Sequence, residues 1–189
     1  PDDVNTLVHE AGHSFHDFAA HRQPLIWQRG TGHEAAELAS MSMELLAMPH
    51  LARPTGYYTP DEARAVEIEQ LEDVLNSLAH IASVDAFQRW IYTSGRGDDA
   101  AARDAAWLQL RARFERGVDW SGLEGERVAR WYRQLHIFEL PFYYIEYGIA
   151  QLGALQLWRD AQRDPAGTMQ RYKRALALGG TRGLPDIYA

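Results

Sequence analysis

The sequence predicts an all-α protein with several helices. No stretch of the 189 residues combines sustained period-two alternation with an enrichment in β-branched residues, so strands are not expected. Signals for helix starts and ends recur instead. The clearest is Thr59–Glu62, which offers an N-cap, a proline at the first helical position and a capping-box glutamate. A chain of this length can bury one good core, so residues 1–189 are interpreted as a single helical domain.

The expected helices follow from these signals in order along the chain. The first covers residues 4–20 and the second residues 33–47. The third begins at Thr59 and runs to about Tyr92, with a break expected near residues 83–85. Later helices are expected at residues 99–116, 124–135 and 141–162, and the last runs from Asp164 to Gly179–Gly180.

Charge and composition narrow the range of partners. The net charge of −7 argues against nucleic acid as a main partner. No run of about 18 apolar residues occurs, so no membrane span is expected. The absence of cysteine excludes disulfides and thiolate ligands and fits a cytoplasmic location. Any bound metal must therefore be held by histidine and carboxylate side chains.

The strongest chemical signal lies in the first expected helix, where His9, Glu10 and His13 form an H-E-x-x-H motif. Residues four apart share a helix face, so both histidines can bind one ion at about 2.0–2.1 Å from each nitrogen. Glu10 follows the first histidine and is placed to act as a base on a water beside the metal. These ligand types indicate one zinc ion, although they also admit manganese or cobalt.

Catalytic zinc needs a third protein ligand and one open position. The second expected helix offers three glutamates: Glu34, Glu37 and Glu44. We select Glu37, which follows His13 by 24 residues, because two antiparallel helices can bring its carboxylate to the histidine pair. Three further side chains are candidates for orienting the ligands. They are Ser40, Glu44 and Asp17.

One rival arrangement uses His16, which lies near the same helix face as His9 and His13. A His13–His16 pair lacks a properly placed base, so it is the weaker choice. The remaining histidines have no matching partners, and each is interpreted as a surface or core residue: His21, His33, His50 and His80.

The sequence around these residues resembles a known family. Residues Asp3–His16 resemble the active-site helix of the thimet oligopeptidase/oligoendopeptidase F family of zinc peptidases, family M3. Residues Glu37–Leu46 are similar to the family's second signature, in which the first glutamate is the third zinc ligand, and this supports Glu37 over Glu34. Two further segments resemble the oligoendopeptidase F branch, namely Asp85–Tyr92 and Leu184–Tyr188.

The resemblance covers essentially the whole chain. It implies a multi-helix gluzincin-type catalytic domain with the H-E-x-x-H motif on a core helix. Family members are much longer and carry a large N-terminal helical portion that closes over the site. The chain therefore resembles a C-terminal catalytic part, whose expected partners are short peptides and the N-terminal portion of the same polypeptide.

A second segment with expected chemistry is His136–Gly148, which is rich in aromatic residues. Peptide hydrolysis builds negative charge on the former carbonyl oxygen, which preset imidazole or phenol donors can stabilise. His136, Tyr143 and Tyr147 return to one helix face if Pro141 does not interrupt the helix. The alternative is an aromatic stripe packed in a helical core.

The family resemblance favours the catalytic interpretation of this segment, because a histidine followed by several tyrosines supplies such contacts in the family. It implies catalytic roles for His136, Tyr143 and Tyr147 and a substrate contact for Tyr144. Which tyrosine meets the transition state stays open at this point.

The sequence thus predicts a zinc-dependent endopeptidase that hydrolyses short oligopeptides through a metal-activated water, with Glu10 as the base. A dipeptidyl-carboxypeptidase-like gluzincin is one alternative, although the run from Ser40 to Leu46 argues against it. A non-catalytic metal-binding helical domain is another, and the presence of Glu10 argues against that.

Overall fold

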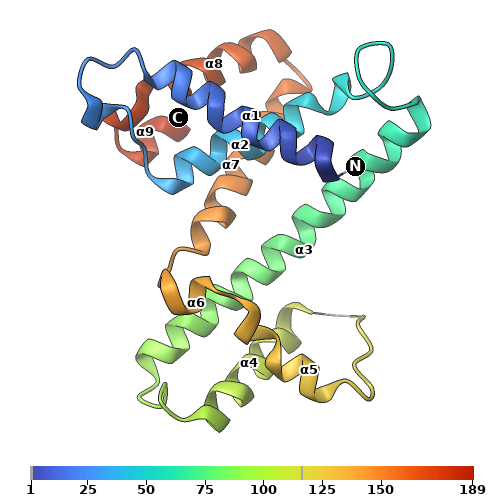
Figure 1. Cartoon of the computed structure of the whole chain (residues 1–189), viewed down its shortest axis with the longest axis vertical. Coiled ribbons are helices and arrows are strands. Elements are labelled where there is room, and N and C mark those ends of the chain that lie inside the picture. Colours follow the sequence, from blue (N-terminus) through green and yellow to red (C-terminus); the bar gives the residue numbers. More distant parts are fainter. Residues whose placement is uncertain (1, 116) are drawn as a thin grey trace. The chain divides into compact units, whose positions relative to one another are not determined.

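The computed structural model describes residues 2–115 and 117–189, and within these ranges it contains helices and no strand (Figure 1). The nearest approach to a sheet is an isolated bridge between Ala52 and Tyr58. The predicted all-α fold is therefore confirmed. The chain divides into two compact units: unit 1 comprises Pro1–Glu72 and Ile149–Ala189, and unit 2 comprises Asp73–Gly148. That both units serve one catalytic domain stays a prediction.

Unit 1 contains the helix that carries the H-E-x-x-H motif. Its elements are α1 (Asp2–Ala20), η1 (Ile26–Gln28), α2 (His33–Ala47), η2 (Met48–His50), the first turns of α3 (Pro60–Thr93), most of α7 (Ile145–Ala161), α8 (Pro165–Leu178), η4 (Gly179–Thr181) and α9 (Leu184–Tyr188). Helix α1 packs against α2 and α8. The core around α2 joins Leu38 and Leu45 to Ala150 and Ala154 of α7.

The close approach of α1 to α2 depends on the glycine inside the motif. A Cβ atom at Gly12 would lie 2.6 Å from the Ser40 Cα and 2.8 Å from the Ala39 carbonyl oxygen. Any larger residue would have to push the two backbones apart. The Tyr172 hydroxyl of α8 donates to the same Ala39 carbonyl at 2.6 Å. These contacts fix the spacing at which the two helices present their side chains.

Helix α3 begins as predicted and ends at Thr93, next to the predicted end at about Tyr92. The Thr59 amide donates to the Glu62 carboxylate at 2.8 Å, and the Glu62 amide donates to the Thr59 hydroxyl at 3.4 Å, which is the reciprocal capping box. The break expected near residues 83–85 is wrong, because α3 runs uninterrupted to Thr93. Ser83 is accommodated because its hydroxyl donates to the Ala79 carbonyl at 2.8 Å inside the helix.

Unit 2 holds the rest of α3 with α4 (Ala100–Phe114), α5 (Glu124–Ala129), η3 (Arg130–Arg133), α6 (His136–Glu139) and the start of α7. Its core is aromatic. The buried Phe87 ring lies edge-on to Trp107 and Trp131, with ring centroids 5.4 and 5.3 Å apart. Such edge-to-face pairs stabilise a core beyond the area they bury.

Two of the helices expected in the second half have wrong boundaries. The helix expected at 124–135 is split into α5 and η3, and the helix expected at 141–162 begins only at Ile145. Phe142 has a positive φ of 62°, which ends helical continuity there. The helix expected to end at Arg116 closes on Glu115 as its C-cap, and Arg116 itself lies outside the described residues. The short helix α9 was not expected.

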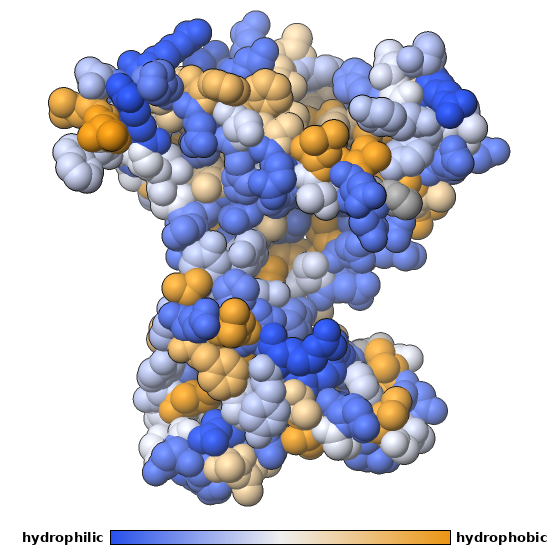
Figure 2. Space-filling view, viewed as in Figure 1, coloured by the Kyte–Doolittle hydropathy of each residue, from blue (hydrophilic) through white to orange (hydrophobic). Residues whose placement is uncertain are grey.

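Several large apolar side chains of unit 1 are exposed, among them Phe15 and Phe18 on α1 and Trp27 on η1. Figure 2 shows apolar side chains at the position that η1 occupies in Figure 1, next to strongly polar ones. In the described part of the chain, no helix is both long enough and apolar enough to cross a bilayer.

Candidate metal centre

The structure brings His9, His13 and Glu37 together, with one ligand atom from each lying within 4.8 Å of the other two. The His9 Nε2 lies 3.6 Å and the His13 Nε2 4.0 Å from the Glu37 Oε2. The two imidazoles meet edge to face, with ring centroids 4.9 Å apart. These N···O distances are too long for hydrogen bonds, so the three side chains face a common point without bonding one another.

Glu44 determines which nitrogen of His9 faces that point. Its carboxylate lies 2.5 Å from the His9 Nδ1 and also accepts from Gln70 Nε2 at 2.6 Å and from Asn5 Nδ2 at 3.3 Å. An ionised carboxylate only accepts hydrogen bonds, so the proton of His9 resides on Nδ1. The lone pair on Nε2 is then directed toward Glu37, as a metal ligand requires.

The surroundings of His9 favour a cation. The hydrogen bond to Glu44 raises the pKa of the His9 imidazole, partial burial opposes the rise, and the charges of Glu37 and Glu10 add to it. The same carboxylates would stabilise any positive ion held between the ligands. About a quarter of the His9 and His13 side chains stays exposed, at 26% and 29%, so the centre is open on one side.

The donor set fits zinc. Zinc takes nitrogen and oxygen ligands at about 2.0–2.2 Å in tetrahedral geometry, which places neighbouring ligand atoms roughly 3.3–3.5 Å apart. The distances from Glu37 to the two imidazoles exceed this spacing by less than about 1 Å. Two imidazoles and one carboxylate also leave the fourth position free, as catalytic zinc sites do.

The structure distinguishes the other candidates around the triad. Glu34 is not part of the cluster. Ser40 is buried, and its hydroxyl lies 3.4 Å from the Glu37 Oε2, so it contacts a candidate ligand as Glu44 does. Asp17 is exposed, and its charge acts on His16. Glu10 is exposed on α1, one residue after His9, and its charge reaches that ring.

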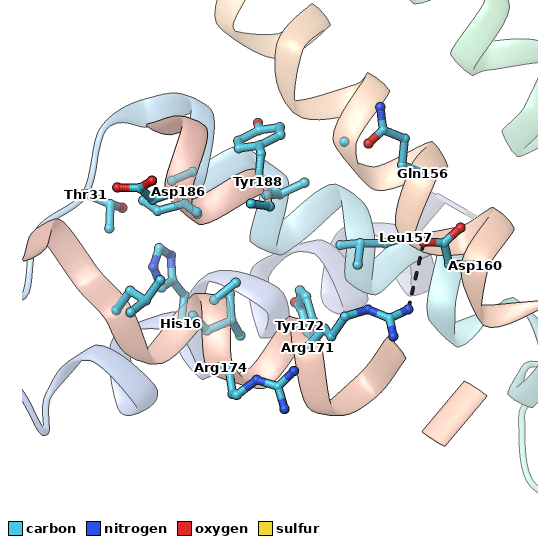
Figure 3. Close-up of a pocket in the computed structure, with 18 residues that line it drawn as sticks. His16, Thr31, Gln156, Leu157, Asp160, Arg171, Tyr172, Arg174, Asp186 and Tyr188 are labelled. Atoms are coloured by element: carbon cyan, nitrogen blue, oxygen red, sulfur yellow. Dashed lines mark ion pairs between the residues drawn. The ribbon is translucent and has the colours of Figure 1, made fainter. Parts of the chain in front are cut away.

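His16 lies in a different environment from His9 and His13. It is buried, and burial lowers the pKa of its imidazole, while Asp17 opposes the shift. It lines a cavity of about 380 Å³ between α2, α7, α8 and α9, in which Tyr172 and Tyr188 also lie (Figure 3). None of the three triad residues lines this cavity. The rival His13–His16 pair gains no third ligand among the described residues.

In unit 2, the predicted His136, Tyr143, Tyr144 and Tyr147 form one ring cluster. The His136 ring lies 5.4 Å from Tyr143, 5.0 Å from Tyr144 and 5.9 Å from Tyr147. Tyr147 lies 5.4 Å from each of the other tyrosines. All four side chains are half-buried, whereas the aromatic core residues of this unit are fully buried.

The predicted arrangement of these residues on one helix face is wrong, although their rings do lie together. They do not share one helix face, because His136 lies on α6, Tyr143 lies outside any helix and Tyr147 lies on α7. The turn at Phe142, whose amide donates to the buried Gln88 Oε1 at 3.3 Å, folds the segment so that the rings gather.

The ring cluster is also contacted by a hydrogen-bonded network that the sequence did not indicate. Gln134 Nε2 lies 2.7 Å from the His136 Nδ1, and Gln134 Oε1 lies 3.0 Å from the His80 Nε2. Arg111 Nη1 lies 3.3 Å from the His80 Nδ1. The two contacts of His80 join residues 31 and 54 positions apart, and helical periodicity carries no signal for them.

Solved structures similar to this chain are peptidases by description. An oligoendopeptidase F structure matches with a TM-score of 0.87 and 31% identity over 98% of this chain and 32% of its own. PZ peptidase A with inhibitor 2 matches with a TM-score of 0.87 and 28% identity over 99% and 33%. A protein assigned as oligoendopeptidase F from Bacillus anthracis matches at 0.76 and 25% over 99% and 29%.

The chain therefore spans about a third of the length of these solved structures. A search of curated proteins found no match. The family model for peptidase family M3 matches residues 1–189, in agreement with the resemblance carried by the two sequence signatures. The chain belongs to peptidase family M3.

Proposed function

We propose that this chain carries the catalytic centre of a zinc-dependent endopeptidase that hydrolyses short oligopeptides. The observation that carries the proposal is the convergence of His9, His13 and Glu37 on one point, with the His9 Nε2 lone pair directed at it. Membership of peptidase family M3 and the similarity to oligoendopeptidases support the reaction class.

The three triad residues would hold one zinc ion. When bound, zinc supplies Lewis-acid chemistry, polarising the peptide carbonyl and making water a stronger acid. Glu44 keeps the His9 ring in the tautomer that ligation needs, and Ser40 contacts the Glu37 carboxylate. The half-open side of the triad leaves room for water and substrate.

Glu10 is the proposed general base. It directly follows His9 on α1 and is exposed, so its carboxylate is free to take a proton from the attacking water. It would then give that proton to the leaving amine. Since it is not part of the ligand cluster, its role is separable from metal binding.

The ring cluster of unit 2 is proposed to stabilise the developing oxyanion. His136, Tyr143 and Tyr147 carry groups that can donate hydrogen bonds, and Tyr144 is the proposed substrate contact. Their half-buried state supports this, because donors to substrate must be held in place and remain reachable. The family resemblance supports it independently.

We further propose that residues 1–189 work as the catalytic part of a longer polypeptide, since the matched structures are about three times as long. Short peptides are the proposed substrates, and the rest of that polypeptide is the proposed partner. A cytoplasmic location stays a prediction.

The test is hydrolysis of a quenched oligopeptide by the complete polypeptide, before and after metal removal by a chelator and again after zinc is restored. Zinc-dependent cleavage at internal bonds, identified by mass spectrometry of the products, is expected. Release of C-terminal dipeptides alone would indicate a dipeptidyl carboxypeptidase. Zinc binding without any cleavage would indicate a non-catalytic metal-binding domain and would contradict the proposal.

A further inference from the structure

We propose that Arg111, His80 and Gln134 form a one-way hydrogen-bond relay that holds His136 as the Nε2–H tautomer, with its donor available to a substrate oxygen. The relay lies wholly within unit 2. Its use in catalysis rests on the proposed function, whereas the tautomer it imposes can be measured without any activity assay.

The direction of the relay begins at Arg111, because a guanidinium group can only donate hydrogen bonds. Its Nη1 lies 3.3 Å from the His80 Nδ1. That nitrogen must therefore be the unprotonated acceptor of the His80 ring, and the ring proton must reside on Nε2. Burial lowers the pKa of His80, the hydrogen bond to Gln134 opposes this, and the positive charge of Arg111 reinforces it, which agrees with a neutral ring.

The next step passes through the amide of Gln134. The protonated Nε2 of His80 lies 3.0 Å from the Gln134 Oε1, which can only accept. Reversing the amide would place its NH₂ group against that N–H and leave His80 between two donors. The orientation of Gln134 is thus decided by Arg111 through His80, and does not depend on telling oxygen from nitrogen in the amide itself.

The last step fixes His136. With its oxygen toward His80, Gln134 directs its NH₂ group at the His136 Nδ1, 2.7 Å away. That nitrogen must accept, so the proton of the neutral His136 ring resides on Nε2. Gln134 also hydrogen-bonds the Tyr144 side chain, so one amide organises two members of the ring cluster.

Arg111, at which the relay begins, is held in place by an ion pair. Arg111 is buried and pairs with Glu115, whose side chain is also shielded, at 2.5 Å. Burial would raise the pKa of Glu115, but donors from Arg111, Trp120 and Arg130 keep it below its usual value. Glu115 therefore stays ionised and fixes Arg111 in place. Arg111, His80 and Gln134 act through His136 and are positioning residues.

The direct test is long-range ¹H–¹⁵N NMR on the complete, zinc-loaded polypeptide with labelled histidine, with His136 assigned by the loss of its signals in His136→Gln. We expect a proton on Nε2 and none on Nδ1. In Gln134→Glu the carboxylate can only accept, so the His136 proton should move to Nδ1. The same variant should lose about 10²-fold or more in kcat, with a small change in KM, because an oxyanion donor acts in the transition state.

Two variants serve as controls. His80→Gln keeps an oxygen to accept from Arg111 and an NH₂ group to donate to Gln134, so the His136 proton should remain on Nε2. Gln109→Glu makes the same charge change at an exposed position of α4 and should change neither the tautomer nor kcat. If Gln134→Glu does not fold, the position of the ring proton in the wild-type spectrum decides the question.

A proton on Nδ1 of wild-type His136 overturns the relay, as does a folded Gln134→Glu protein that keeps the wild-type tautomer. These results would leave the proposed peptidase function untouched if peptides are still cleaved. Conversely, the expected tautomers in a protein that cleaves no peptide would support the relay and contradict the proposed function.

Discussion

His9 of unit 1 and His136 of unit 2 are both contacted at Nδ1, but the two partners have opposite hydrogen-bonding roles. Glu44 accepts from the His9 Nδ1 and leaves a lone pair on Nε2. Gln134 donates to the His136 Nδ1 and leaves a proton on Nε2. A carboxylate behind the ring thus prepares a metal ligand, whereas an amide behind the ring prepares a hydrogen-bond donor.

The two histidines are also supported by different kinds of structure. The triad stands on two continuous helices that Gly12 allows to pack closely. The ring cluster is gathered from α6, a turn with a positive φ at Phe142, and α7. Helix pairs hold ligands at a fixed spacing, as metal geometry demands. A cluster built on a turn relies on its hydrogen-bond network for orientation.

Loss of a triad ligand should have the largest effect. His13→Ala removes one of the two imidazoles and should abolish both zinc binding and peptide hydrolysis. Zinc content after gel filtration, together with the peptide assay, checks this. The matched control is His50→Ala, an exposed histidine outside both sites, which should retain zinc. A His13→Ala protein that keeps stoichiometric zinc would exclude His13 as a ligand.

Glu10→Gln, on the same helix as His13, should lower the rate of peptide hydrolysis without affecting zinc binding. Loss of the general base should lower kcat by about 10²–10⁴-fold, while zinc remains bound because the side chain is outside the ligand cluster. Zinc content and kcat are measured on one preparation. Equal zinc loss in Glu10→Gln and His13→Ala would mean that Glu10 is a ligand and that the assigned roles are wrong.

Tyr147→Phe tests the ring cluster of unit 2, whose members are the proposed hydrogen-bond donors. Removing one phenol that stabilises the oxyanion should lower kcat by about 10²–10³-fold with zinc content unchanged. Tyr132→Phe, at an exposed tyrosine of the same unit outside the ring cluster, is the control and should behave as wild type. If Tyr147→Phe retains full kcat, that hydroxyl is not a transition-state donor.

Glu44→Ala tests the orienting partner of His9. Without the acceptor at Nδ1 the ring is free to change tautomer, and zinc affinity should fall by about 10–100-fold. Glu44→Gln retains an oxygen that can accept from His9 and should lose less. Competition with a chromophoric chelator measures both affinities. Equal zinc affinity of Glu44→Ala and wild type would show that Glu44 does not orient His9 for zinc binding.

The smallest effect concerns stability and pH in unit 2. Burial lowers the pKa of His80 below its ordinary value of 6.5, and Arg111 and Arg130 add to this, whereas the Gln134 hydrogen bond and Glu115 oppose it. The unfolded chain therefore binds a proton near pH 6.5 more readily than the folded chain does. The free energy of unfolding should be greatest above that pH and should fall as the pH decreases through it.

Denaturant unfolding of wild type and His80→Gln between pH 5 and 8 checks this dependence. The decrease toward low pH should be smaller in His80→Gln than in wild type, whereas His50→Gln should follow wild type because His50 is exposed. The same pH dependence in wild type and His80→Gln would show that His80 is equally easy to protonate in the folded and unfolded chains.

The sequence predicted the fold class and the His9–His13 pair because both depend on local periodicity, whereas Glu37 was selected from the pairing of two helices and from the family resemblance. The i, i+4 spacing of His9 and His13 and the helix carrying Glu37 are visible in a single segment. The ring cluster was predicted by resemblance, but its assembly was not, since helical spacing cannot anticipate the turn at Phe142. The relay through His80 was missed altogether, because its partners come from distant parts of the chain and a lone histidine gives no pattern.

The assignment of His9, His13 and Glu37 as the ligands of one zinc ion underlies every other proposed role. Anomalous diffraction above and below the zinc absorption edge, from crystals of the zinc-loaded polypeptide, tests it most directly. We expect a single zinc peak in this chain, bonded to the His9 Nε2, a His13 ring nitrogen and a Glu37 carboxylate oxygen at about 2.0–2.2 Å. A zinc peak bonded to other residues, or none near the triad in a protein that cleaves peptides, would contradict this assignment.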